Sequence, residues 1–267
     1  MRMPLNTKPL DLLVFTDLDG TLLDHQTYDW SPAKPAVQAL RSKGAGLILA
    51  SSKTAAEIVA VRKSIQMEQW PSIVENGAGV LAPYRDQCED ATHYQNIRDA
   101  LSALPLHIRT CFIGFADMSI SEVAENTGLS QTAAALAKDR AFSEPGLWQG
   151  DEKGKLQFID ILETKGITAQ QGGRFLTLSF GADKADQIQK LTKQYNPART
   201  IALGDAPNDI AMLEAAHIGV VLLNPHSPDI PMLSGEKEGK IIRTTDFGPA
   251  AWNAIILELL NNQQPPN

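Results

Sequence analysis

The chain has 267 residues, 43% of them apolar and 21% charged, which is typical of a folded globular protein and excludes a disordered or fibrous one. Its formal net charge of −7 provides no positive field for phosphate backbones or anionic lipid, so we expect neither a nucleic acid nor a membrane as partner. The two cysteines are too few for a disulfide scaffold, and no apolar run is long enough to span a membrane or to serve as a leader segment. We therefore expect a cytoplasmic protein.

Apolar runs alternate with helical patterns at both ends of the sequence. The run Leu12–Phe15 predicts a strand, followed by a polar stretch and by helical spacing over residues 36–43. A second strand is expected at residues 47–50, and Thr54 with Glu57 has the form of a capping box that opens a helix to about residue 66. The pattern continues with strands at 73–74, 201–203, 218–223 and 241–242 and a helix at 208–216. Such alternation predicts an α/β fold with a parallel sheet covered on both faces.

The pattern of helices and strands expected from the sequence changes between about residues 84 and 180. Helical stretches at 94–104 and 130–138 are mixed there with strand-like runs at 111–115, 156–162 and 175–180, which is an α+β pattern. We therefore expect a core domain made of residues 1–83 and 183–267, interrupted by an inserted domain over residues 84–182.

Polar side chains stand directly after the predicted strands. Ligands bind at the carboxyl ends of parallel strands, so these positions are the first candidates for a functional site. Carboxylates gathered at such an edge repel one another unless a cation lies among them, and hard oxygen ligands favour Mg²⁺. The residues concerned are Asp17, Asp19, Ser51, Asp205 and Asp209, with Lys184 at the start of a later helix.

These residue types fit phosphoryl transfer. Asp17 could attack phosphorus to form an aspartyl-phosphate, because a metal ion and Lys184 would offset its repulsion from the phosphate dianion. Asp19, on a turn that Gly20 permits, could protonate the leaving oxygen and later deprotonate the attacking water. Ser51 and the first N–H groups of the following helix could bind phosphoryl oxygens.

The same residues have simpler interpretations when each is taken alone. Ser51 could cap a helix, and Lys184 could be a solvated lysine at a helix start. A calcium-binding EF-hand is excluded, because its loop needs glycine at the sixth place and glutamate at the twelfth, whereas Gly20 is fourth and Tyr28 twelfth. The Gly77–Ala82 segment matches a dinucleotide-binding pattern, but Pro83 stands where the helix should continue.

Taken together, the DxDGT run, the serine after the second strand, the later lysine and the GDxxND run resemble the haloacid dehalogenase superfamily of phosphatases, whose motifs follow this order. The resemblance implies a Rossmann-like core with an inserted α/β cap domain. Further stretches resemble the mannosyl-3-phosphoglycerate phosphatase family over nearly the whole chain. They are residues 24–28, 52–54, 75–77, 140–145, 172–175 and 204–209. One departure is Ala185, which follows Lys184 where the family usually has glycine.

This resemblance implies a Mg²⁺-dependent phosphoric monoester hydrolase that converts mannosyl-3-phosphoglycerate to mannosylglycerate and phosphate, acting as a monomer or homodimer. It implies Asp17 as nucleophile, Asp19 as acid and base, and Mg²⁺ held by Asp17, the Asp19 carbonyl and Asp205, with Asp209 orienting the site. Residues expected to contact the substrate are Gly20, Ser52, Lys53, Asn76, Arg140, Ser143, Glu144, Gly173, Arg174 and Asn208. Arginine presents a planar fork suited to a carboxylate, although Arg140 and Arg174 could also form surface ion pairs.

Three alternatives remain open at this point. The enzyme could act on glucosyl-3-phosphoglycerate or another hexose phosphate, because one sequence does not reveal the orientation of a single sugar hydroxyl. It could pass the phosphoryl group to a sugar, as a mutase does. It could also bind a phosphorylated metabolite without catalysis, and phosphate release from a generic phosphomonoester would distinguish this case.

Overall fold

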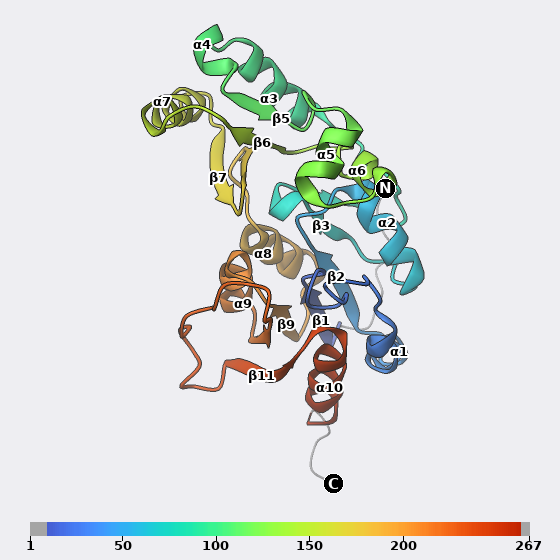
Figure 1. Ribbon diagram of the computed structural model, residues 1–267. Helices are drawn as coiled ribbons and strands as arrows, with labels where there is room; N and C mark the ends of the chain where they lie inside the picture. The colour runs from blue at the N-terminus through green and yellow to red at the C-terminus, as the bar shows by residue number, and fades with distance from the viewer. Residues whose placement is uncertain (1–9, 263–267) are drawn as a thin grey trace. The chain divides into compact units, whose positions relative to one another are not determined.

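A computed structural model describes residues 10–262, which divide into two compact units (Figure 1). The described part of the first unit comprises residues 10–51, 65–72 and 184–262, and the second comprises residues 52–64 and 73–183. The first unit thus combines segments from both halves of the sequence. The domain boundaries expected from the sequence stay a prediction.

The first unit contains five parallel strands in the order β11-β10-β9-β1-β2. Their bounds are β1 Leu12–Thr16, β2 Gly46–Ala50, β9 Arg199–Gly204, β10 Ile218–Leu223 and β11 Ile241–Phe247. Strands β1 and β2 are apolar except for Thr16 and buried throughout, which is typical of a parallel sheet covered on both faces. Thr16 pairs in register with both Leu49 and Leu203, so the carboxyl ends of β1, β2 and β9 lie at one level.

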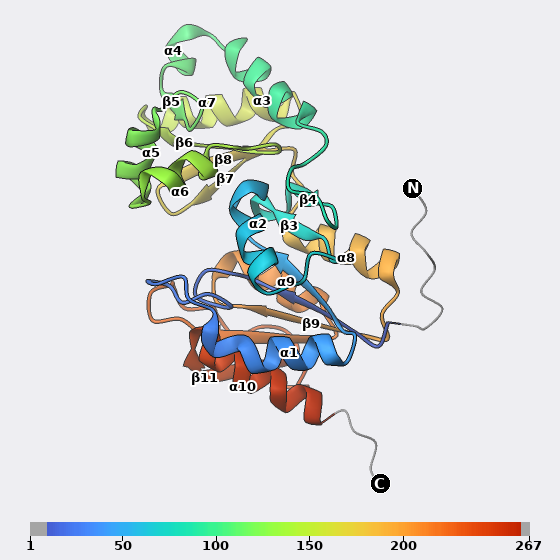
Figure 2. The ribbon, with the colours of Figure 1, turned by 90° about the vertical axis from the view of Figure 1, so that its right-hand side faces the viewer.

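Helices cover both faces of this parallel sheet (Figure 2). Helices α1 and α10 pack together on one face, and α8 and α9 pack together on the other. Their bounds are α1 Lys34–Ser42, α8 Lys184–Tyr195, α9 Ile210–Ala215 and α10 Gly248–Asn261, with short 3-10 turns η1 Ser31–Ala33 and η3 Pro207–Asp209. Trp252, Ile255, Ile256 and Leu259 of α10 recur at helical spacing and are buried. The indole of Trp252 also donates to Thr16 Oγ1 at 3.0 Å, which ties α10 to the end of β1.

The second unit has a four-stranded antiparallel sheet in the order β5-β6-β8-β7. One core, formed with α3, α4 and α7, includes the stacked rings of Phe112 and Phe158; a second core, formed with α5 and α6, includes Phe115. Figure 2 shows α3 and α7 on one side of this sheet and α5 and α6 on the other. The elements are α2 Ala55–Ser64, β3 Ser72–Val74, η2 Glu75–Gly77, β4 Gly79–Leu81, α3 Thr92–Ser102, α4 Leu106–Arg109, β5 Phe112–Gly114, α5 Ile120–Thr127, α6 Gln131–Ala137, β6 Glu144–Trp148, α7 Glu152–Glu163, β7 Thr168–Gly172 and β8 Phe175–Ser179.

The expected α/β class with a parallel sheet is confirmed. The capping box before α2 is also confirmed, since the Thr54 N–H donates to Glu57 Oε2 at 2.9 Å and the Glu57 N–H donates to Thr54 Oγ1 at 3.3 Å. The strand expected at residues 156–162 is wrong, because these residues lie in helix α7. Asp151 caps that helix by accepting from the Gly154 N–H at 2.7 Å, and Phe158 and Leu162, four residues apart, are its buried side chains.

Within residues 10–262, we find no helix that combines the length and the apolar character needed to cross a membrane.

Candidate active site

The carboxyl edge of the parallel sheet gathers the charged side chains that follow its strands. Asp17 comes directly after β1, and its N–H donates to the Leu203 carbonyl of β9 at 2.9 Å. Asp205 follows β9, and Asp209 ends the short turn η3. Carboxylate oxygens of Asp17, Asp205 and Asp209 lie within 4.8 Å of one another, and all three residues are buried. The edge therefore concentrates negative charge where little water can screen it.

Lys184, the first residue of α8, places its ammonium group between two of these carboxylates. Its Nζ atom lies 2.7 Å from Asp17 Oδ1 and 2.7 Å from Asp209 Oδ1, and the residue is 2% exposed. Burial lowers the pKa of Lys184, but the two aspartates more than offset this and raise it above its usual value. Lys184 is therefore a fixed positive charge in the site at neutral pH.

Burial raises the pKa of Asp17 well above its usual value, and the neighbouring Asp209 and Asp205 add to this, against the opposing effect of Lys184. The pKa of Asp205 is also raised, chiefly by burial and further by Asp209. One ammonium thus does not balance three carboxylates in this cluster.

Asp205 is oriented by two side chains from other loops. Thr21 Oγ1 donates to Asp205 Oδ1 at 2.6 Å, and Asn224 Nδ2 donates to Asp205 Oδ2. Gly20 makes this arrangement possible, because it has a φ of +83° and a Cβ built there would lie 2.6 Å from Asp205 Oδ2. The turn that follows Asp17 is therefore shaped around the carboxylate of Asp205.

Asp209 uses both of its oxygens within the protein. Oδ1 accepts from Lys184, and Oδ2 accepts from the N–H groups of Asp205 and Ala206, each at 3.2 Å. Gly204 permits this approach, since a Cβ there would lie 2.5 Å from the Cβ of Asp209. Asp209 thereby fixes both the lysine and the turn that carries Asp205.

The cluster fits a divalent cation. Its oxygen atoms are hard ligands in small number, and Mg²⁺ is bound in proteins by one or two carboxylates together with water and substrate oxygens. Asp17, Asp205 and Asp209 are the described residues whose carboxylate oxygens lie close enough together to hold the ion. A cation would also balance the excess negative charge.

The other predicted residues of the first unit lie along the same loops. Asp19 is partly exposed in a turn closed by hydrogen bonds from the Leu23 N–H to the Leu18 carbonyl and from the Gly20 N–H to the Leu23 carbonyl. Ser51 is buried directly after β2, and Asn208 is exposed in η3. The parallel sheet thus brings Asp17, Lys184, Asp205 and Asp209 into contact, with Gly20 beside them.

In the second unit, Arg140 and Ser143 are bound to Glu75. Arg140 Nε lies 3.3 Å from Glu75 Oε2, and its terminal nitrogens donate to the carbonyls of Ala137 and Ser52 at 3.3 and 3.2 Å. The hydroxyl and the N–H of Ser143 both donate to Glu75 Oε2 at 2.7 Å. The side chain of Arg140 is 8% exposed and Ser143 is fully buried, so both are held by protein groups here.

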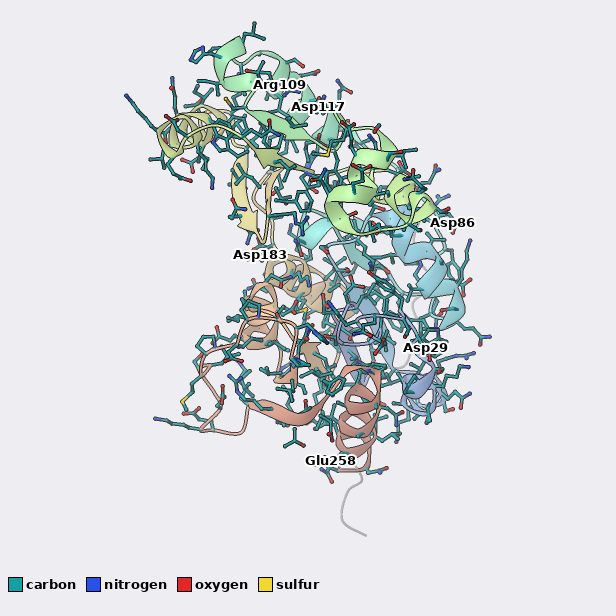
Figure 3. All side chains as sticks on the ribbon, in the orientation of Figure 1. Asp29, Asp86, Arg109, Asp117, Asp183 and Glu258 are labelled. Carbon is teal, nitrogen blue, oxygen red and sulfur yellow. The ribbon has the colours of Figure 1, made fainter. Side chains whose placement is uncertain are left out.

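Glu144 is fully buried on the side of the antiparallel sheet that faces α3. It accepts hydrogen bonds from Tyr94 Oη at 2.8 Å, Arg98 Nη1 at 3.0 Å and the Ala116 N–H at 2.9 Å. Burial raises the pKa of Glu144, against the opposing effect of these donors. Arg98 also forms an ion pair with Asp117, and Asp117 forms a second ion pair with Arg109. Asp117 and Arg109 are labelled in Figure 3. Glu144 therefore lies inside a network of the second unit.

The remaining predicted residues of this unit are more accessible. Gly173 and Arg174 are exposed in the turn between β7 and β8, where Arg174 Nη1 donates to the Asn126 carbonyl at 2.6 Å. Ser52 is exposed, and Lys53 and Asn76 are partly exposed.

Sequence reasoning did not single out Thr21, Asn224 or Glu75 as functional residues. Asn224 directly follows β10, so the rule used for the other strand ends would have found it. Thr21 stands in the same short run as Asp17 and Asp19, but its bond to Asp205 depends on the turn at Gly20. Glu75 lies in the 75–77 stretch that resembles the family, but its role could not be predicted, because its side-chain partners are more than sixty residues away in sequence.

A model of the haloacid dehalogenase-like hydrolase family matches residues 14–123 and 150–228. The chain belongs to this family. The prediction that this protein is an enzyme that hydrolyses phosphoric monoesters is confirmed by its family and its relatives.

Two curated relatives of this haloacid dehalogenase-like hydrolase are both named glucosyl-3-phosphoglycerate/mannosyl-3-phosphoglycerate phosphatase. The protein from Methanococcoides burtonii is 31% identical, over 93% of this chain and 97% of its own length. The protein from Persephonella marina is 33% identical, over 94% of this chain and 97% of its own length. A solved HAD-superfamily phosphatase from Bacteroides thetaiotaomicron shares the fold, with a TM-score of 0.62 at 17% identity over 97% of each chain.

Proposed function

We propose that this hydrolase releases phosphate from mannosyl-3-phosphoglycerate, giving mannosylglycerate, through an aspartyl-phosphate on Asp17. The contact of Lys184 with Asp17 inside the carboxylate cluster is the observation that carries the proposal for the chemistry. The names of the two curated relatives support the choice of substrate, and they include the glucosyl compound.

In the first step, Asp17 is the nucleophile. Lys184 holds its Oδ1 atom and so orients the carboxylate, while its other oxygen attacks phosphorus. The bond between phosphorus and the ester oxygen breaks, and Asp19 protonates the departing sugar-glycerate alcohol. The positive charge of Lys184 offsets the repulsion between Asp17 and the incoming phosphate dianion.

In the second step, water attacks the phosphorus of the aspartyl-phosphate. Asp19, now ionised, takes a proton from this water, and the bond between phosphorus and the Asp17 oxygen breaks. Asp17 is thereby regenerated as a carboxylate paired with Lys184, and phosphate leaves. Ser51, buried at the end of β2, is proposed to donate its hydroxyl to a phosphoryl oxygen in both steps.

Mg²⁺ is the proposed cofactor, held by the carboxylates of Asp17 and Asp205 and by the backbone carbonyl of Asp19. When bound, it supplies positive charge to the phosphoryl oxygens. Asp209 stabilises this site by fixing the positions of Lys184 and of the turn that carries Asp205. Thr21 and Asn224 fix the carboxylate of Asp205 itself.

The residues proposed to recognise the sugar and the glycerate are taken from those predicted from the resemblance. They are Gly20, Ser52, Lys53, Asn76, Arg140, Gly173, Arg174 and Asn208. Ser143 and Glu144, which the resemblance also implies, are fully buried and held by protein groups, so we do not propose them as direct contacts. Arg174 is the candidate for the glycerate carboxylate, because it is an exposed arginine on a glycine-containing turn.

Phosphate release from a panel of sugar phosphates tests the proposal. The panel contains mannosyl-3-phosphoglycerate, glucosyl-3-phosphoglycerate and simple hexose phosphates, each with Mg²⁺ and with EDTA. We expect metal-dependent release that is fastest with mannosyl-3-phosphoglycerate. Faster release from the glucosyl compound or a hexose phosphate would contradict the proposed substrate but would agree with the proposed reaction. No release from any ester would contradict both.

A further inference from the structure

The carboxylate of Glu75 is the centre of a hydrogen-bond cluster in the second unit. Its Oε1 accepts from the Ala141 N–H at 2.8 Å, and its Oε2 accepts from the Phe142 and Ser143 N–H groups at 3.2 and 2.7 Å. The Ser143 hydroxyl and Arg140 Nε also contact Oε2. The side chain is 1% exposed. Every one of these donors comes from four consecutive residues, so a single carboxylate fixes the conformation of the whole 140–143 segment.

The backbone around Glu75 is held in a conformation that side chains rarely adopt. Glu75 and Asn76 have φ values of +51° and +58°, followed by Gly77 at +96°. Such left-handed residues cost free energy and persist only where the surroundings determine them strongly. Here the Glu75 N–H donates to the Lys53 carbonyl at 2.9 Å, which connects the turn to a second segment. The hydrogen bonds of Glu75 thus compensate for its backbone strain.

Glu75 therefore joins three separate segments, namely residues 52–53, 75–77 and 140–143. Arg140 strengthens the junction, because it contacts Glu75 and also donates to the Ser52 carbonyl. Each of the three segments contains residues proposed to bind the substrate. A buried carboxylate that served stability alone would bring little advantage, since its desolvation cost offsets much of its attraction to Arg140.

We propose that Glu75 is a positioning residue for substrate recognition: it sets the relative placement of Lys53, Asn76 and the 140–143 segment, and thereby the affinity for the sugar-glycerate part of the substrate. It does not touch the substrate and takes no part in phosphoryl transfer. This inference rests on the proposed function, because it assigns the three segments to substrate binding.

The test compares Glu75→Gln with the wild type on two esters, mannosyl-3-phosphoglycerate and p-nitrophenyl phosphate, both with Mg²⁺. Glutamine keeps the size of the side chain but loses the charge and one acceptor for the three backbone N–H groups. We expect KM for the sugar ester to rise about tenfold or more, because hydrogen bonds to a charged group are lost. We expect kcat for that ester, and both constants for p-nitrophenyl phosphate, to stay within about twofold of the wild type.

Glu122→Gln is the matched control. Glu122 is a glutamate of the same unit whose carboxylate also accepts from a backbone N–H, that of Ser119 at 2.7 Å, but it caps α5 and contacts none of the three segments. We expect it to leave all four constants unchanged. Equal losses on both esters in Glu75→Gln, or no rise in KM for the sugar ester, would overturn the positioning role.

Ser143→Ala provides a second variant in case Glu75→Gln does not fold. It removes one hydroxyl donor to Glu75 and leaves the buried charge and the backbone donors in place. We expect a smaller rise in KM, again restricted to the sugar ester, and an unchanged KM would contradict the proposal. If the wild type prefers another sugar phosphate, the proposed substrate fails alone, and the same comparison with that preferred ester still tests Glu75.

Discussion

The ammonium of Lys184 lies 2.7 Å from Asp17 Oδ1 and at the same distance from Asp209 Oδ1, with all three residues buried. This contact joins Lys184, at the start of helix α8, to Asp17, directly after strand β1, and the two residues are 167 positions apart in the sequence. It makes Lys184 both an electrostatic partner of the proposed nucleophile and a structural link within the first unit.

Replacing Lys184 by methionine removes this link while retaining much of the side-chain volume. Because two buried carboxylates lose their partner, we expect unfolding in urea to require about 3–5 kcal/mol less free energy. We expect kcat to fall about a hundredfold or more, since the charge beside the nucleophile is lost. The control is Lys63→Met, whose partner Asp86 is exposed; we expect its stability to change by less than about 1 kcal/mol. A similar loss of unfolding free energy in the two variants would contradict the importance of the buried contact.

The raised pKa values of Asp17 and Asp205 predict how pH affects metal binding. In the metal-free protein, Asp17 and Asp205 contribute to the free energy of unfolding when they are protonated. This contribution is complete at a pH below 3.8, the ordinary pKa of an aspartate, and it is lost as the pH rises through the raised pKa of the folded protein. Binding of Mg²⁺ needs the ionised carboxylates and so displaces protons.

We therefore expect the rise in Tm caused by a fixed Mg²⁺ concentration to grow as the pH is raised from about 5 to about 8. Differential scanning calorimetry measures this rise, with Asp205→Asn as a variant in which the effect should be much smaller. A rise in Tm that is larger at the acidic end would contradict the assignment of the metal to these carboxylates.

Gly20→Ala is expected to disturb the site beyond its backbone cost. The residue has a φ of +83°, and the added methyl would lie 2.6 Å from Asp205 Oδ2. Gly128 has a similar φ of +79° but no atom within 4 Å of a built Cβ, so Gly128→Ala isolates the backbone cost of about 1–2 kcal/mol. We expect only the Gly20 variant to lose about tenfold or more in kcat/KM. Equal activity in the two variants would show that the turn tolerates the methyl group.

Thr21→Val and Asn224→Ala each remove one donor to the carboxylate of Asp205. Because such partners orient a metal ligand, we expect the Mg²⁺ concentration for half-maximal activity to rise about 10–100-fold in each variant. Activity at saturating Mg²⁺ should recover most of the wild-type rate. Thr27→Val, which removes an exposed hydroxyl bonded to Asp24, should leave the Mg²⁺ dependence unchanged. The assignment fails if the Thr27 variant behaves like the other two.

Several elements of the two units follow from local rules of the sequence. The buried apolar runs of β1 and β2 and the capping box of α2 are visible in a single sequence, and the strand-end rule points to Asp17 and Asp205. The helix at residues 156–162 is harder to recognise from the sequence. Leu156, Ile159 and Ile161 are apolar yet not buried, so they hide the helical spacing of the buried Phe158 and Leu162.

The partners of the site residues could not be predicted in the same way. The contacts of Thr21 and Asn224 with Asp205, and those of Glu75 with residues 140–143, depend on how loops turn and meet in space. A left-handed backbone at Glu75 also contradicts the ordinary preference of glutamate. Such positions are set by the tertiary structure, which a local pattern does not contain.

The most direct test of the proposed mechanism is whether Asp17 carries the phosphoryl group during turnover. The enzyme is mixed with mannosyl-3-phosphoglycerate and Mg²⁺, quenched in acid within milliseconds, digested, and examined by mass spectrometry. We expect one transient phosphoryl group on the peptide that contains Asp17, absent with EDTA and absent in Asp17→Asn. Rapid phosphate release by Asp17→Asn, or a phosphoryl group on another residue of the wild type, would contradict this mechanism.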